Sequence, residues 1–190
     1  MNPQFSHRQS LSFQILLALV VIFLAGALRF APHPPNLAPI GAIALFSGAI
    51  IRDRRIAFVF PLLAFFARDL FIGYHKLTLI VCASFLFNVA IGLWLRDRRS
   101  VSRISLATLA GAIQFFLVTN FGVWLLLDTY AKTSAGLVAC YIAGLPFFWN
   151  TLAGDALYSA LLFGGYALAE RVFPAHRTQS SSSWLTNLPS

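Results

Sequence analysis

Charged residues are scarce in this chain of 190 residues, and this scarcity excludes an ordinary soluble fold. They make up 11% of the sequence, whereas hydrophobic residues make up 58%. Because charged residues usually account for about a quarter of a soluble domain, the composition indicates an integral membrane protein. Cysteine is scarce as well. Cys82 and Cys140 both fall inside apolar stretches, which argues against a disulfide framework and against a zinc site.

Several catalytic signatures are also missing from the sequence. It has no Walker A sequence, no HExxH motif and no nucleophile elbow, which argues against a self-powered pump and against an ordinary hydrolase. It has no internal repeat either, and its length fits one compact bundle.

Arginine, by contrast, is gathered in clusters between six apolar stretches. Each cluster follows an even number of stretches: Arg8 precedes the first, and the others lie at 52–55, 96–103 and 171–177. Basic residues collect on the cytoplasmic side of membrane proteins, so we predict that the N- and C-termini are both cytoplasmic. The net charge of +8 then belongs to loops beside anionic lipid headgroups, and we expect no nucleic-acid partner.

The apolar stretches predict an all-α integral membrane protein, with a bundle of six transmembrane helices in residues 1–177 and a disordered cytoplasmic tail at 178–190. The predicted spans are 11–30, 37–51, 56–74, 77–95, 104–127 and, within 136–170, a crossing over 150–169. We expect a short helix from Gly136 and a break near Pro146, because proline interrupts helices. The segment 136–148 then re-enters from the outside. If it crosses fully instead, the C-terminus lies outside.

Polar side chains gather at the outer ends of these predicted spans. An ionisable group at membrane depth costs about 2.5–3.5 kcal/mol on insertion scales, so it should face protein or a water-filled cavity. The outer positions include His33, Asp69, Tyr74, Cys82, Asn120 and Tyr141, and the inner ones are Gln14, Asn88, Gln114 and Asp155. This distribution predicts a polar pocket that opens to the outside.

Each of these groups also has a purely structural interpretation. Asp69 can pair with a neighbouring basic side chain to hold helices together, and His33 can be a loop residue near the headgroups. The tyrosines can form an interfacial aromatic belt. Cys82 can be a small packing residue, and Cys140, which has no polar company in the sequence, is expected to be inert.

Several short motifs resemble a known family of small bacterial membrane proteins. They are HPPNLAPIGA at 33–42, TNFGVW at 119–124, ACY at 139–141, PFF at 146–148, NT at 150–151 and GD at 154–155. This set is similar to the substrate-binding S components of energy-coupling-factor vitamin transporters. Within that group it most resembles the solitary vitamin B12 transporters of the BtuM family. The resemblance covers about residues 29–170 and implies a multi-pass protein of the bacterial inner membrane.

The resemblance implies that the chain binds cobalamin and takes it up. Cys82 would ligate the cobalt of cobalamin and assist catalytically in the reductive loss of cyanide, and a thiolate is a soft, strong donor suited to cobalt. Asp69 and His33 match an aspartate and a histidine that lie near this cysteine in the B12 branch, whereas Phe87 and Trp149 depart from its pattern. The other ligand-binding residues expected at the edge of the corrin are Asn36, Tyr74, Asn120 and Tyr141.

Two other functions stay open at this point. The chain can be an S component for another vitamin that depends on an energising ATPase module, or a structural membrane protein without a ligand. S components that dock on such a module carry small residues every four positions on the first helix, whereas residues 15–24 contain only Ala18. We therefore expect a monomer that works without this module, with a corrinoid and membrane lipids as partners and no other cofactor.

Overall fold

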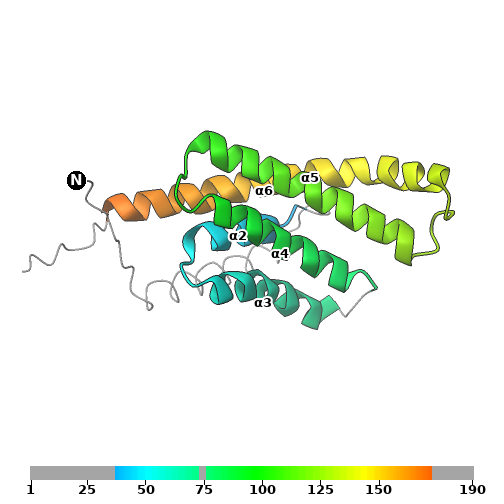
Figure 1. Ribbon diagram of the computed structural model, residues 1–190, viewed down its shortest axis with the longest axis horizontal. Coiled ribbons are helices and arrows are strands. Elements are labelled where there is room, and N and C mark those ends of the chain that lie inside the picture. The colour runs from blue at the N-terminus through cyan, green and yellow to red at the C-terminus, as the bar shows by residue number, and fades with distance from the viewer. Residues whose placement is uncertain (1–36, 73–75, 173–190) are drawn as a thin grey trace, which may run out of the picture.

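The described part of the chain consists of helices packed side by side (Figure 1). A computed structural model describes residues 37–72 and 76–172, and these residues form five helices and no strands. The helices are α2 (Ile40–Ile50), α3 (Arg54–Ile72), α4 (Thr78–Trp94), α5 (Val101–Leu126) and α6 (Ser134–Val172). The all-α prediction is therefore confirmed for these residues. The predicted span at 11–30 and the predicted tail at 178–190 lie outside them.

Four predicted spans correspond to the helices α2 to α5. The spans at 37–51, 56–74, 77–95 and 104–127 each overlap one helix, whose ends lie within three residues of the predicted ones. Capping explains two of the starts. The Asp53 carboxylate accepts hydrogen bonds from the backbone N–H groups of Arg55 and Ile56 at the start of α3. The Ser100 hydroxyl accepts one from Arg103 N–H at the start of α5.

The last apolar segment forms a single helix, so the prediction of a break near Pro146 is wrong. α6 runs from Ser134 to Val172 with Pro146 inside it. The proline removes one backbone hydrogen bond, which the Ile142 carbonyl would otherwise accept, but neighbouring helices commonly keep such helices continuous in membranes. α6 packs along α5, as Figure 1 shows. The segment 136–148 is therefore part of α6 and not a separate re-entrant element.

The shortest helix, α2, is also the most enclosed. Ten of its eleven residues are buried, and it contacts α3, α4, α5 and α6. Where α2 crosses α4, a Cβ atom added to Gly48 would lie 3.0 Å from the Cα atom of Gly92. Because ordinary carbon–carbon contacts are about 3.5–4.0 Å, this close crossing requires glycine.

Arg96, which follows α4, holds the C-terminal end of α2. Its guanidinium donates hydrogen bonds to three backbone carbonyls, those of Gly48 (2.8 Å), Ile51 (2.6 Å) and Arg52 (3.2 Å). The last carbonyls of a helix lack partners within it, and a cation is stabilised at this negative end of the helix dipole. Burial, followed by repulsion from Arg54, lowers the pKa of Arg96, whereas the attraction of Asp97 raises it.

Two of the arginine clusters, those at 52–55 and 96–103, meet at one end of the bundle. Arg96 joins the cluster at 96–103 to the carbonyl of Arg52 in the cluster at 52–55. Arg99 lies over the ring of Tyr166 near the end of α6, with its guanidinium carbon 5.5 Å from the ring centre. Charges that are far apart in the sequence thus lie at the same end of the molecule, which we call the arginine end.

Of the described helices, α5 and α6 are long and apolar enough to cross a membrane, judged by length and composition. Both expose large apolar side chains, among them Leu106, Leu117 and Phe121 on α5 and Ile142, Leu161 and Leu168 on α6. Extensive apolar surface of this kind is typical of a face that meets lipid or another protein. The described structure is therefore consistent with a membrane-associated protein.

Candidate ligand pocket

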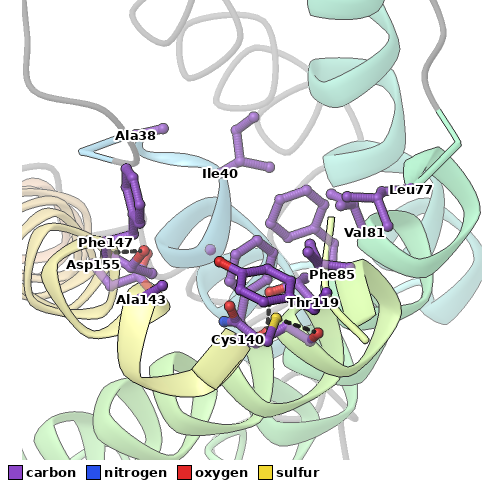
Figure 2. A pocket seen from close by; sticks show the side chains of 17 residues that line it. Ala38, Ile40, Leu77, Val81, Phe85, Thr119, Cys140, Ala143, Phe147 and Asp155 are labelled. Carbon is purple, nitrogen blue, oxygen red and sulfur yellow. Dashed lines mark hydrogen bonds between the residues drawn. The ribbon is translucent and has the colours of Figure 1, made fainter. Parts of the chain in front are cut away.

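A cavity of about 450 Å³ lies between α2, α4, α5 and α6. It reaches the first turn of α4, the last turns of α5 and the loop before α6, so it lies at the end of the bundle opposite the arginine end. Small-molecule sites typically have volumes of about 300–1,000 Å³. The lining, drawn in Figure 2, consists of Ala38, Ile40, Gly41, Leu77, Val81, Phe85, Phe115, Thr119, Asn120, Val123, Tyr130, Cys140, Ala143, Gly144, Phe147, Thr151 and Asp155.

One wall of the cavity is apolar and comes from α4 and α5. Leu77, Val81 and Phe85 follow at four-residue spacing, so they share one face at the start of α4. The Phe85 ring stacks on Phe115 of α5, with ring centres 5.4 Å apart and ring planes 21° apart. In Figure 2 this wall lies opposite Phe147 and Asp155 of α6. A ligand between the two sides would have apolar contacts on one side and polar groups on the other.

Asn120 is a predicted ligand-binding residue that does line the cavity. Its side-chain nitrogen donates to the Phe116 carbonyl at 2.8 Å, which leaves the side-chain oxygen as an acceptor. A Cβ atom added to Gly144 would lie 2.9 Å from Asn120 Cγ, so glycine makes room for this side chain between α5 and α6. Cys140, expected to lack polar neighbours, also lines the cavity and donates from its thiol to the Asn120 backbone carbonyl at 3.4 Å.

Asp155 forms the floor of the cavity. Its side chain is only 4% exposed and reaches from α6 to the first turn of α2. The carboxylate accepts a hydrogen bond from the Ala42 backbone N–H, and a Cβ atom added to Gly41 would lie 2.7 Å from its Oδ2 atom. The residue before α2, Pro39, provides no side-chain cap. Because a helix N-terminus has unpaired N–H groups and a positive dipole end, Asp155 caps α2 from a different helix.

Beneath Asp155 the interior stays polar but is closely packed. Ser159, one turn further along α6, accepts a hydrogen bond from the Thr108 hydroxyl at 3.2 Å. Across the same region, the Gln114 amide donates to the Asn88 side-chain oxygen at 2.9 Å. The recess between Asp155 and Asn88 leaves no room for a water molecule. The cavity therefore ends at Asp155 and does not continue to the arginine end.

The other predicted site residues lie outside the lining or outside the described residues. Cys82 is buried in the core with Ile40 and Phe60, and it does not line the cavity. Tyr141 does not line it either, and its hydroxyl donates to the Leu117 carbonyl of α5 at 2.8 Å. Among the predicted site residues, the structure does not describe His33, Asn36, Tyr74 and the side chain of Asp69.

Cys140 and Asp155 belong to the lining although the sequence did not assign them to the pocket. For Asp155 the sequence did contain a signal, because a carboxylate inside an apolar span is costly and usually functional. The sequence placed Asp155 among the inner polar residues and not in the outward pocket. In the continuous helix, Phe147, Thr151 and Asp155 follow at four-residue spacing and line the same cavity.

The chemical character of the lining is that of a binding site. The Thr119 and Thr151 hydroxyls donate to carbonyls one turn back, at 2.7 Å and 3.0 Å, so they present oxygen lone pairs to the cavity. Asn120 and Asp155 add further acceptors. Within the ranges that the structure describes, no group of three or more His, Cys, Asp or Glu side chains is placed to hold a metal ion. The lining therefore offers a ligand apolar contact and hydrogen-bond acceptors, and it also includes the Tyr130 hydroxyl, which can donate.

Comparison with known proteins relates nearly the whole chain to one family. The family of unknown function DUF6580 has a family model that matches residues 9–176, and this range includes every described helix and the complete cavity lining. No curated protein and no solved structure shows a significant match.

Proposed function

We propose that this chain, which belongs to the family of unknown function DUF6580, binds a small amphipathic molecule in the cavity and takes it up across the bacterial inner membrane. The observation that carries this proposal is the cavity itself. It has the volume of a small-molecule site, an apolar wall from α4 and α5, and acceptors contributed by α5 and α6. Transport proteins commonly place such sites between membrane helices, where an ionisable group faces the site and not the lipid.

The proposed orientation places the cavity on the outside of the membrane. Basic loops remain in the cytoplasm, so the arginine end is the inner end and the cavity lies at the outer one. A continuous α6 contributes a single crossing. With the predicted span at 11–30, the chain then makes six crossings and both termini are cytoplasmic.

Cobalamin is the specific ligand that we propose, on the basis of the motif resemblance. Cys82 would supply the thiolate to cobalt. It follows Val81, which lines the cavity, but lies about 100° further around α4, toward the core formed with α2 and α3. A corrinoid bound through Cys82 would therefore lie on the α3 side of α4. A corrinoid in the cavity would instead lie near Cys140.

Two cysteine variants distinguish these positions. Cobalamin is added to the purified wild-type, Cys82→Ser and Cys140→Ser proteins, and the affinity and visible absorption spectrum of the bound corrinoid are measured. Cobalt ligation by Cys82 predicts a changed spectrum for Cys82→Ser alone, because a serine hydroxyl is a much poorer donor to cobalt. A spectral change confined to Cys140→Ser would place cobalt in the cavity. Wild-type protein that binds no cobalamin would reject the cobalamin assignment.

The broader proposal is tested by filling the cavity. Cells that contain the protein are given a panel of labelled vitamins, cobalamin included, and uptake is compared for wild type, Val81→Trp and Leu79→Trp. Val81 lines the cavity, whereas Leu79 lies on the same helix and is 81% exposed. We expect uptake of one compound, lost in Val81→Trp and kept in Leu79→Trp. Equal uptake by the two variants would rule out the cavity as the route, and a chain with a purely structural role would take up none of the panel.

A further inference from the structure

Of the described residues that line the cavity, Asp155 alone has a carboxyl group. It is also 4% exposed, so its carboxylate has little contact with solvent. Burying a carboxylate without a cation is costly, and buried charges in proteins are usually paired. The partner that the described residues provide is uncharged, the backbone N–H of Ala42. The floor of the cavity thus has a carboxyl group without a described counter-ion.

The Asp155 carboxylate also has unused capacity to accept hydrogen bonds. An ionised carboxyl group offers about four acceptor positions, and the Ala42 amide occupies one of them. Thr151, one turn before Asp155 in α6, directs its hydroxyl hydrogen to the Phe147 carbonyl. The Asn120 side-chain nitrogen donates within its own helix, to Phe116. Neither bond goes to Asp155, so the described residues give its carboxyl group no side-chain donor and a ligand can supply one.

We propose that the ligand presents a nitrogen group with N–H donors to Asp155, and that a protonated amine binds there more tightly than a neutral amide. This inference rests on the proposed function and names the chemistry of the ligand. A hydrogen bond between an ammonium group and a carboxylate is charge-assisted, and a site that excludes water strengthens it. A ligand carboxylate in the same position would meet Asp155 as a like charge, and the described part of the lining contains no arginine, lysine or histidine to compensate for it.

A purely structural role for Asp155, as the cap of α2, predicts a different outcome. In that case Asp155→Asn lowers the stability of the protein but leaves the relative affinities of different ligands unchanged. The ranking of matched ligands, and not affinity or stability alone, therefore distinguishes the two roles.

The test uses three probes with one apolar skeleton: 3-phenylpropylamine, 3-phenylpropionamide and 3-phenylpropionate. Their dissociation constants are measured by equilibrium dialysis against the purified full-length protein in detergent, with binding to empty micelles subtracted. The proteins are wild type, Asp155→Asn and the control Asp128→Asn, in which the same substitution is made at an exposed position outside the cavity lining. The amine should bind wild type about 10- to 100-fold more tightly than the carboxylate, with the amide between them.

In Asp155→Asn the preference for the amine should disappear, and Asp128→Asn should keep it. The inference is overturned if wild type binds the carboxylate as tightly as the amine, or if Asp155→Asn retains the wild-type ranking. If all three probes bind equally, the cavity remains a binding site and only the ligand chemistry is wrong. If none binds, this inference fails and the cavity loses its support as a small-molecule site. If Asp155→Asn does not fold, a wild-type protein that binds the carboxylate as tightly as the amine still overturns the inference.

Discussion

Replacing Gly48 with alanine should destabilise the protein at the crossing of α2 and α4. The added Cβ atom would lie 3.0 Å from Gly92 Cα and from Leu93 N, and closer still to the Val89 carbonyl oxygen. Because carbon–carbon contacts are normally about 3.5–4.0 Å, the two backbones must separate by about 0.5–1 Å. A gap of this size forfeits about a quarter to a half of each dispersion contact across the crossing.

Two opposing effects determine the magnitude of this destabilisation. Overpacking of a close-packed interior costs about 1–3 kcal/mol. Alanine, however, is better than glycine inside a helix by roughly 0.8–1 kcal/mol. All the atoms that the new Cβ would meet belong to the backbone and cannot turn away, so the upper part of the overpacking range applies, and the free energy of unfolding should fall by about 1–2 kcal/mol. For a domain of this size, that corresponds to a decrease of roughly 2–8 °C in melting temperature.

Gly164→Ala is the matched control for this substitution. Gly164 also lies inside a helix, but no atom lies within 4 Å of the position that its Cβ would take. Only the gain in helix propensity remains, so the melting temperature should stay the same or rise. Both variants are melted in the same detergent. The reasoning is refuted if Gly48→Ala is as stable as wild type, or if Gly164→Ala is destabilised to the same extent.

Two further predictions concern the arginine end. Arg96→Met should lower the free energy of unfolding by about 1–3 kcal/mol, because three backbone carbonyls lose a charged donor. Arg96→Lys should restore only part of this stability, since an ammonium group lacks the planar fork of guanidinium. Thermal melting checks both variants, and an unchanged melting temperature in Arg96→Met would contradict the stabilising role of these hydrogen bonds. For topology, a reporter fused at Lys132 should report a position outside the membrane, and one fused after Ser190 a position inside. Replacing Arg52, Arg54 and Arg55 with serine should give a mixture of orientations. The opposite location for either reporter in the unmodified protein would overturn the six-crossing topology.

Much of the described fold follows from hydropathy and from a few local signals. α2 to α5 are apolar runs separated by short polar loops, and such loops mark their limits well because charged residues avoid apolar surroundings. The prediction of a break at Pro146 was wrong for α6. The hydrogen bond that a proline removes can be read from the sequence, whereas the continuity of the helix depends on its packing against α5. The enclosure of α2 was not predicted, because an apolar run that faces lipid and one that faces protein look alike in sequence.

The candidate site was less accessible from the sequence than the fold. Asn120, predicted to bind the ligand, lines the cavity, and its signal in the sequence was an amide near the outer end of an apolar span, which needs a polar environment. Cys140 and Asp155 were missed as lining residues, since their place depends on how α6 is rotated against α5 and α2. The role of Gly41 is also a tertiary effect: it makes room for a carboxylate that lies more than a hundred residues away in the sequence.

The capping of α2 by Asp155 has a consequence for the order in which the molecule is assembled. During synthesis, Gly41 leaves the ribosome roughly 110 residues before Asp155, a delay of about 5–25 s at rates of ~5–20 residues per second. α3, α4 and α5 are all made within this interval, so α2 can pack against them while its amino end still lacks the carboxylate. The floor of the cavity is thus completed last. A nascent chain that has not yet reached the middle of α6 possesses the apolar wall of the cavity but no floor.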